Sequence, residues 1–374
     1  MLSVYRDLGV ILREGRDDNY NRPGQDLSAY QVVRRGDLVL NKMKTWQGSL
    51  GMSELDGIVS PAYFVAQQTS DDDPRYLHYA LRSLPMIAEY AKRSKGIRPA
   101  QWDLPWDEFA DVEIRLPRPD QQRLVADLLD RETTRIDKLI AAKRRFRELL
   151  DARDASAVSD LTVPIDCRFV RLRFLARLQT GVTVDAGREL GQSVVSVPYL
   201  RVANVQAGWL DLADVTEITV TCDLAERSTL RRGDVLMTEG GDLDKLGRGT
   251  LWEGQLERCL HQNHIFAVRP ATDRLDPRFL ALLTRSSHAR RYFEMTGSRV
   301  TNLASTNSEK ILNLPVPQLS LDEQRRLVTK YERVATKLGR LVSAVDRQIQ
   351  ALAERRQSLI AEAIAGQPQP TDAA

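Results

Sequence analysis

Two long stretches of the chain carry a hydrophobic repeat of about 3.5 residues, the period of a coiled-coil seam. Alternating steps of four and three from Val125 to Ala157 reach ten positions, seven of them apolar. The same steps from Leu327 to Leu359 reach ten positions, eight of them apolar. A wider apolar stripe would indicate an ordinary surface helix. The pattern therefore predicts two long helices, over residues 119–160 and 319–366.

The two predicted helices have seams of equal length, so they most simply pair with each other as an antiparallel coiled coil. The positions expected in the seam are Ile136, Leu139, Phe146, Leu150, Leu338, Leu341, Val345 and Leu352. Arg153 and Arg355 fall at equivalent seam positions, where a polar residue can fix the register of the pair. About 36 helical residues span on the order of 55 Å, which is roughly 16 base pairs of duplex DNA. Such a pair could separate two DNA-reading domains.

The regions that precede the helices are related to each other. The segment Arg35-Gly36-Asp37-Leu38-Val39-Leu40 recurs as Arg232-Gly233-Asp234-Val235-Leu236-Met237, and Gln122-Arg123 recurs as Gln324-Arg325. The offset drifts in one direction along the chain, as expected for a duplication with small insertions. Each Gly-Asp pair predicts a turn that leads into a strand. The expected fold is α+β: two similar β-rich globular domains over 1–118 and 161–318, each followed by its helix, and a disordered tail over 367–374.

Composition narrows the class of protein. The chain has 374 residues, of which 42% are hydrophobic and 28% charged, with a formal net charge of +3. No apolar run reaches the length of about 18 residues that a membrane span needs, and the first residues lack the pattern of a signal peptide. Three widely spaced cysteines fit neither a disulfide framework nor a four-cysteine zinc site. These features predict a cytoplasmic protein, and the charge permits a nucleic-acid partner without requiring one.

Motifs for catalysis are missing from the sequence. We find no Asn/Asp-Pro-Pro-aromatic motif of an amino-methyltransferase and no phosphate-binding loop of the G-x-x-x-x-G-K-[ST] type. The glycine-rich segment 239–249 lacks the Lys-Ser/Thr pair of a nucleotide site, and Leu246 stands where a calcium loop needs an oxygen ligand. Cys259, His261 and His264 could supply metal ligands, but on a strand His264 would face away from the other two. We therefore expect no catalytic residue and no metal site.

Several segments resemble the specificity subunit of type I restriction–modification systems. They are Tyr30 to Gly48, Asp56 to Tyr63, Pro198 to Gly208, Leu230 to Leu236, and the Glu323-Gln324-Arg325-Arg326 entry to the second helix, with Gln121-Gln122-Arg123 as its counterpart. The resemblance implies two target-recognition domains that each read half of a bipartite DNA site, and helices that set the gap between half-sites. It also implies docking of DNA adenine methyltransferase subunits, two in number, and of restriction/translocase subunits. S-adenosylmethionine, ATP and Mg would be bound by those partners and not by this chain.

One feature departs from a simple duplication. The second globular domain has about 34 residues, Asp166 to Tyr199, with no counterpart before Leu2. The first target-recognition domain is therefore expected to be shortened at its N-terminus.

Candidate DNA contacts are polar or aromatic residues near glycines, because such residues can reach phosphates and base edges. They are Asn41, Lys42, Lys44, Trp46, Gln47, Lys95, Arg98, Arg201, Asn204, Arg248, Arg299 and Asn302. Two other functions remain open at this point. The chain could be a stand-alone DNA-binding or coiled-coil scaffold protein, or a fragment of a fused restriction–methylation enzyme.

Overall fold

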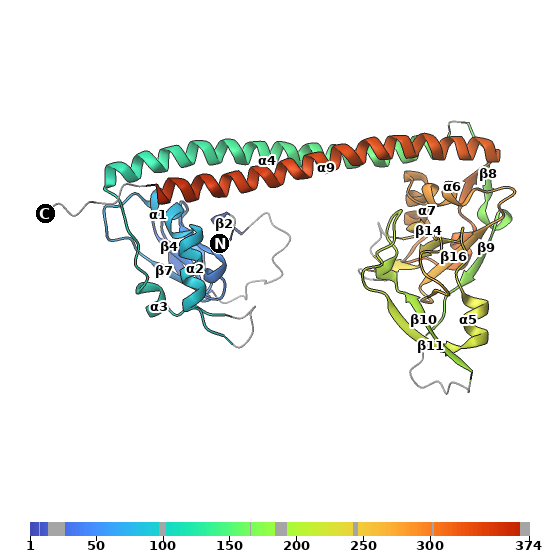
Figure 1. The fold of residues 1–374 in the computed structure, drawn as a ribbon, viewed down its shortest axis with the longest axis horizontal. Coiled ribbons are helices and arrows are strands. Elements are labelled where there is room, and N and C mark those ends of the chain that lie inside the picture. The colour runs from blue at the N-terminus through green and yellow to red at the C-terminus, as the bar shows by residue number, and fades with distance from the viewer. Residues whose placement is uncertain are drawn as a thin grey trace. The chain divides into compact units, whose positions relative to one another are not determined.

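The computed structural model describes residues 1–6, 8–13, 27–96, 102–164, 166–183, 193–241, 246–300 and 303–366. The chain divides into two compact units. Unit 1 consists of residues 1–144 and 347–374, and unit 2 of residues 145–346. Both units combine small sheets with helices, which confirms the predicted α+β class (Figure 1).

Unit 1 combines small sheets with short helices. Its strands are β1 (Leu2–Tyr5), β2 (Gly9–Leu12), β3 (Gln31–Val33), β4 (Leu38–Asn41), β5 (Leu50–Met52), β6 (Gly57–Val59) and β7 (Tyr63–Ala66), and its short helices are η1 (Thr45–Gln47), α1 (Pro74–Leu81), α2 (Leu84–Arg93) and α3 (Trp106–Ala110). Among the described residues the strands pair in the orders β1-β2, β3-β6 and β5-β4-β7. Leu40, Leu50, Tyr90 and Leu104 form one buried cluster between the β5-β4-β7 sheet and the helices.

Unit 2 repeats this plan with additional strands. Its strands are β8 (Phe169–Arg171), β9 (Ala176–Thr180), β10 (Val194–Leu200), β11 (Thr216–Thr221), β12 (Val235–Thr238), β13 (Gly240–Gly241), β14 (Gly249–Leu251), β15 (Leu260–His261), β16 (Ile265–Pro270), β17 (Ser298–Val300), β18 (Leu303–Ser305) and β19 (Pro315–Pro317), and its short helices are η3 (Leu172–Phe174), η4 (Val202–Asn204), α5 (Cys222–Ser228), α6 (Pro277–Leu283), α7 (Ser287–Thr296) and α8 (Ser308–Leu312). The central sheet has the order β14-β12-β16-β9 in the described part of the unit.

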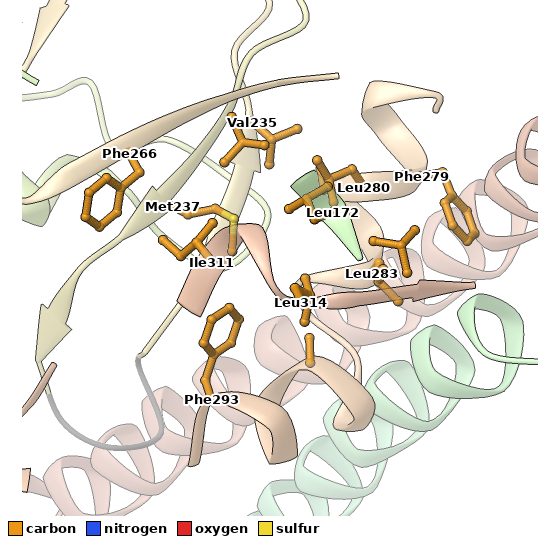
Figure 2. Close-up of a cluster of buried hydrophobic side chains, with 14 of the residues drawn as sticks. Leu172, Val235, Met237, Phe266, Phe279, Leu280, Leu283, Phe293, Ile311 and Leu314 are labelled. Atoms are coloured by element: carbon orange, nitrogen blue, oxygen red, sulfur yellow. The ribbon is translucent and has the colours of Figure 1, made fainter. Parts of the chain in front are cut away.

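The core of unit 2 lies between this central sheet and helices α6, α7 and α8. Figure 2 shows Val235, Met237 and Phe266 of the sheet facing Phe293 and Ile311 of the helices. All five side chains are at most 4% exposed. Burying a large apolar side chain contributes roughly 1.5–3 kcal/mol, so this cluster is a main source of stability in the unit.

The two Arg-Gly-Asp segments form the same tight turn, as the sequence predicted. Gly36 and Gly233 have φ angles of +92° and +95°, a conformation that glycine adopts without steric cost. The Asp37 carboxylate accepts a hydrogen bond of 2.7 Å from the Arg34 amide. Asp234 accepts one of 2.8 Å from the Arg231 amide. Each turn therefore delivers the chain into the central strand of its sheet, β4 or β12.

Two long helices complete the fold: α4 (Pro119–Thr162) and α9 (Leu321–Ala365). The boundary between the units falls inside both of them. In unit 1 the start of α4 pairs with the end of α9, where Arg356 contacts Asp137 at 3.0 Å. In unit 2 the end of α4 pairs with the start of α9, where Tyr331 donates to Asp154 at 3.0 Å. Within each unit the helices are antiparallel, as predicted (Figure 1).

The seam of this pair differs from the predicted one at every second position. Buried or half-buried residues of α4 recur at Ala126, Leu129, Thr133, Ile136, Ile140, Lys143, Arg147, Leu150, Asp154 and Ala157. Adding 202 gives the corresponding positions in α9, from Val328 to Leu359, and these are also buried or half-buried. Ile136, Leu150, Leu338, Val345 and Leu352, which the sequence analysis assigned to the seam, belong to these buried or half-buried rows.

Leu139, Phe146 and Leu341 were assigned to the seam wrongly. Their exposed fractions are 45%, 43% and 40%, and each lies one residue before a true seam position. Arg153 and Arg355 are also exposed, so neither is a seam residue. At Leu139 and Leu341 the error arose because the next residue, Ile140 or Val342, is also apolar, whereas Phe146 is an exposed apolar residue before the half-buried Arg147. A hydrophobic period of 3.5 residues fits two sets of positions: one in which the step after Leu129 is three residues, as predicted, and one in which it is four, as observed.

A second repeated motif escaped the sequence analysis. Asp73 and Asp276 each precede a proline at the first turn of a helix, α1 or α6. Each carboxylate accepts a hydrogen bond of 2.9 Å from the amide two residues on, that of Arg75 or Arg278. This is the ordinary N-cap geometry. Proline is tolerated at the first helical position because the backbone N–H of that residue would have no partner within the helix. The shared Asp-Pro-Arg-aromatic-Leu string was the available signal.

Candidate nucleic-acid interface

The loop after β4 in unit 1 contains five of the candidate DNA contacts. Gly48, with a φ of +93°, ends the short η1 helix and returns the chain into β5. The Asn41 side-chain oxygen accepts from the Met43 amide at 3.1 Å, and the Asn41 carbonyl accepts from the Thr45 hydroxyl at 2.7 Å. These bonds give the loop a defined shape at the end of a rigid strand.

The candidate side chains of this loop divide into two groups. The Lys42 ammonium donates to the Pro61 carbonyl at 2.8 Å and lies 4.4 Å from the centre of the Phe64 ring. Trp46 contacts Trp102, with ring centroids 5.0 Å apart, and its indole nitrogen donates to the Met43 carbonyl. Both residues therefore support the loop. Lys44 is exposed and Gln47 is half-buried.

The second candidate cluster of unit 1 follows α2. The exposed Lys95 ammonium lies 2.6 Å from the Glu108 carboxylate, and this contact lowers the pKa of Glu108. The backbone of Lys95 pairs with that of Asp103. A phosphate that bound Lys95 would compete with Glu108 in an exposed, weak ion pair. Arg98 lies outside the described residues.

In unit 2 the structure corrects one candidate. Asn204 is 4% exposed, and its amide group donates to the carbonyls of Asp211 and Asp214 at 2.8 and 2.9 Å. Its side-chain oxygen accepts from the Arg201 amide at 2.7 Å. The prediction that Asn204 contacts DNA is therefore wrong, because the side chain is buried and its hydrogen bonds hold the 201–214 loop together.

Arg201 and Arg248 remain at the surface of unit 2. The Arg201 guanidinium pairs with the Asp214 carboxylate at 2.8 Å, and both groups are substantially exposed. Arg248 is half-buried and lies 3.5 Å from the Gln206 side-chain oxygen. Arg299 belongs to β17, which pairs with β18, and Asn302 lies outside the described residues.

Sequence reasoning missed an exposed tryptophan in the turn that begins at Gln206. Trp209 is 57% exposed and closes the turn in which its carbonyl accepts from the Gln206 amide. Gly208, with a φ of +88°, donates its amide to the Gly249 carbonyl at 3.1 Å, so the turn is fixed against β14. An exposed aromatic ring can stack on a base. A lone tryptophan in a Gly-containing polar segment was the available signal.

The metal-ligand candidates do not converge in the structure. Cys259 and His261 are each 1% exposed, and burial raises the pKa of the Cys259 thiol to about 12 and lowers the pKa of His261. His264 instead contacts the Glu239 carboxylate at 2.5 Å. Within the described ranges, no group of three or more His, Cys, Asp or Glu residues is placed to hold a metal ion.

The long helices carry an apolar surface of their own. No helix in the described part of the chain has the length and apolarity of a bilayer crossing.

Helix α4 nevertheless exposes several large apolar side chains: Leu124 is 71% exposed and Leu149 is 60% exposed. Leu128, Leu139 and Phe146 are 38–45% exposed. By helical spacing the three of these residues in unit 1, Leu124, Leu128 and Leu139, lie on one side of α4, away from the seam, and we call this side the apolar flank.

Comparison with known proteins gives a consistent result. No family model matches the chain. A putative type I restriction enzyme MjaX specificity subunit of Methanocaldococcus jannaschii is 21% identical over 170 residues, covering 44% of this chain and 38% of the relative. The type I restriction enzyme EcoKI specificity subunit of Escherichia coli is 23% identical over 289 residues, covering 73% of this chain and 60% of the relative. The matches thus span less than two thirds of either relative.

A solved structure from work on complex assembly and conformational transition of the type I R-M system shares the fold, with a TM-score of 0.70 and 17% identity. That likeness covers 89% of this chain and 83% of the solved one. The HsdS subunit of Thermoanaerobacter tengcongensis also matches, with 17% identity and a TM-score of 0.48, over 90% of this chain and 82% of that one. The resemblance predicted from the motifs is confirmed: the chain is similar to type I specificity subunits in sequence and shares its fold with a type I R-M structure.

Proposed function

We propose that the chain is the DNA-recognition subunit of a cytoplasmic type I restriction–modification complex and has no catalysis of its own. Each unit would read one half of a bipartite DNA site, and partner subunits would methylate adenine or cut the DNA. Those partners would bind S-adenosylmethionine, ATP and Mg. The observation that carries the proposal is the duplication: two related domains each present a surface loop and each continue into one of two paired helices.

The loops give each unit a surface suited to DNA. In unit 1 the exposed Lys44 projects from a loop held by Asn41, Lys42 and Trp46. In unit 2 Arg248 lies beside the exposed Trp209 turn. Lysine and arginine suit phosphates, and arginine also suits guanine edges. A net charge of only +3 agrees with local contacts of this kind rather than with a globally basic surface.

The apolar flank of α4 supports the partner part of the proposal. Exposed leucines rarely gather on one side of a long helix unless another surface covers them. In unit 1 the basic residues Arg131, Arg135 and Lys138 lie between Leu128 and Leu139 along α4, and together with Leu139 they line a shallow hollow. We propose that a helix of a methyltransferase subunit packs here, with acidic residues opposite these basic ones.

Adenine methylation tests the whole function. Genomic DNA from cells with and without this chain, both containing the proposed methyltransferase subunits, should differ in methylated adenines at one bipartite sequence. Identical methylation in the two strains would contradict the recognition role. Sequence-independent DNA binding together with no effect on methylation would favour the stand-alone scaffold instead.

The flank has a separate test. Leu139→Asp should weaken methyltransferase binding by at least about tenfold while the chain keeps its thermal stability, because Leu139 is already 45% exposed. The matched control is Ala141→Asp, which places the same charge on an exposed position of the other side of α4. Equal binding by both variants would contradict docking on this flank.

A further inference from the structure

One glutamine in each unit is almost completely buried at the joint between domain and helix. Gln122 is 0% exposed and Gln324 is 2% exposed. Both occupy the fourth residue of their long helix, α4 or α9. A buried amide is costly unless its hydrogen bonds are made, so its partners show what the residue does.

The two glutamines make the same three kinds of contact. The side-chain oxygen of Gln122 accepts from the Asp73 amide at 2.9 Å, and that of Gln324 accepts from the Asp276 amide at 2.8 Å. Asp73 and Asp276 are the N-caps of α1 and α6. One glutamine therefore connects the first turn of each long helix to the first turn of a domain helix.

The side-chain nitrogens complete the joint. Gln122 donates to the Pro117 carbonyl at 2.8 Å and to the Asp72 carboxylate at 2.6 Å. Gln324 donates to the Leu319 carbonyl at 2.9 Å and to the Arg274 carbonyl at 3.0 Å. Each planar amide thus binds three segments: the domain helix, the loop before it, and the segment that leads directly into the long helix.

We propose that Gln122 and Gln324 are positioning residues that set the angle between each DNA-reading domain and its own helix. Three hydrogen bonds to one planar group restrict rotation at the joint more than apolar packing does. The angle matters because the helices are long. A tilt of about 10° displaces a point 20 residues along a helix by roughly 5 Å, whereas one base-pair step of DNA is about 3.4 Å.

This inference rests on the proposed function for its consequence, which is the spacing of the two half-sites. A joint that tilts freely would let the domains reach half-sites separated by one base pair more or less. A joint fixed by the glutamines would restrict the complex to one spacing. The two residues would therefore help to determine specificity without touching DNA.

The experiment uses the full chain with Gln122→Met and Gln324→Met, which keep the side-chain length and remove the hydrogen bonds. Val39→Ala and Val235→Ala are the matched controls. Both valines are 0% exposed and lie in the central strand of a sheet, so these variants lose stability away from the joint.

The first measurement is methylation of substrates whose spacer is one base pair longer or shorter. The glutamine variants should lose discrimination between the correct and altered spacers by about tenfold, equivalent to about 1.4 kcal/mol. The valine controls should keep the strict preference at a temperature where they are as destabilised as the glutamine variants. Equally strict spacing in all four variants would overturn the proposal.

The second measurement does not depend on DNA. Spin labels at Arg35→Cys in the reading domain and Ala141→Cys in α4, both exposed positions of unit 1, report the joint directly. Cys167→Ser and Cys222→Ser remove the accessible native thiols. The distance distribution should broaden with Gln122→Met and not with Val39→Ala.

The two measurements separate the possible failures. If the wild-type complex methylates no site, the proposed function is wrong. The spin-label distances alone then decide whether Gln122 restricts the angle between the domain and α4. An unbroadened distribution in Gln122→Met would show that the glutamine only stabilises the fold, and would overturn the positioning role.

Discussion

Strands β7 and β16 are equivalent elements of the two units, yet only β16 is deeply buried. Both pair antiparallel with the strand that comes directly after the Gly-Asp turn, which is β4 in unit 1 and β12 in unit 2. All four residues of β7 are half-buried, whereas five of the six residues of β16 are buried. Strand β9 pairs with the other side of β16, while β7 lies at the edge of the described sheet.

The difference shows that a repeated sequence does not give equal burial. Phe64 and Phe266 occupy the same place in register, opposite Leu40 and Met237. Phe266 is a buried member of the main core of unit 2, while Phe64 is half-buried at the edge of the unit 1 cluster and also contacts Trp106 and Lys42. Burial therefore depends on which neighbouring segment covers the strand.

A second contrast involves the two turn aspartates. Asp234 is 0% exposed and makes a two-point contact with the Arg269 guanidinium, with both distances 2.7 Å. Asp37 makes the corresponding turn bond, but Gln67 stands at the position equivalent to Arg269. The same turn is thus tied to the neighbouring strand by an ion pair in unit 2.

The strongest test of the comparison is loss of the equivalent phenylalanines. Phe266→Ala should lower the free energy of unfolding of unit 2 by about 3–5 kcal/mol, because it leaves a cavity in a closed core. Phe64→Ala should cost unit 1 only about 1–2 kcal/mol. Hydrogen exchange of each sheet measures the two effects separately. Equal losses would show that β7 is as well covered as β16.

Removing the turn carboxylates should have the next largest effect. Asp234→Ala leaves Arg269 without its carboxylate partner and should destabilise unit 2 by about 3 kcal/mol. Asp37→Ala loses a turn hydrogen bond and should cost about 1 kcal/mol. Denaturant titration of each variant gives these values. The idea that the ion pair distinguishes the units fails if Asp37→Ala is the more damaging change.

Acid should weaken unit 1 through His78. Burial, aided by the positive charge of Arg82, lowers the pKa of His78 to about 3 from an ordinary value of 6.5. The unfolded state therefore binds the proton first, and stability falls as the pH drops from 6.5 toward 3, by up to about 1.4 kcal/mol per pH unit. We expect a loss of about 2 kcal/mol between pH 6.5 and 5.

The control for this prediction lies in the other unit. His261 also has a lowered pKa because of burial. His78→Gln should flatten the pH dependence of unit 1 alone, and His261→Gln that of unit 2 alone, as followed by hydrogen exchange between pH 5 and 7. A steep acid dependence of unit 1 in His78→Gln would assign the effect to other groups.

The smallest expected effect concerns the charged residues of the helices. Arg153→Leu with Arg355→Leu should change stability by less than about 0.5 kcal/mol, because both side chains are exposed. Arg356→Leu removes the partner of Asp137 and should cost about 0.5–1 kcal/mol. Thermal unfolding measures both variants. A larger loss of stability in the double variant would indicate that Arg153 and Arg355 lie in the seam after all, as the sequence analysis predicted.

The sequence by itself determined the elements of the fold and their duplication. Glycine at the Gly36 and Gly233 turns, proline at the start of α4 and a period of 3.5 residues act locally, so their consequences can be read along the chain. The likeness to type I specificity subunits followed from the same motifs. Candidate loop residues such as Lys44 were found because polar residues beside glycines mark a surface loop.

Only the tertiary structure decided which of these residues are buried. Leu139 and Ile140 are adjacent and equally apolar, and only packing against α9 selects Ile140 for the seam. Asn204 is a polar loop residue whose hydrogen bonds turn it inward. Gln122 and Gln324 were visible as a repeat, but their contacts reach residues about 50 positions earlier in the chain. Interactions over such separations depend on how the segments pack, which no local pattern specifies.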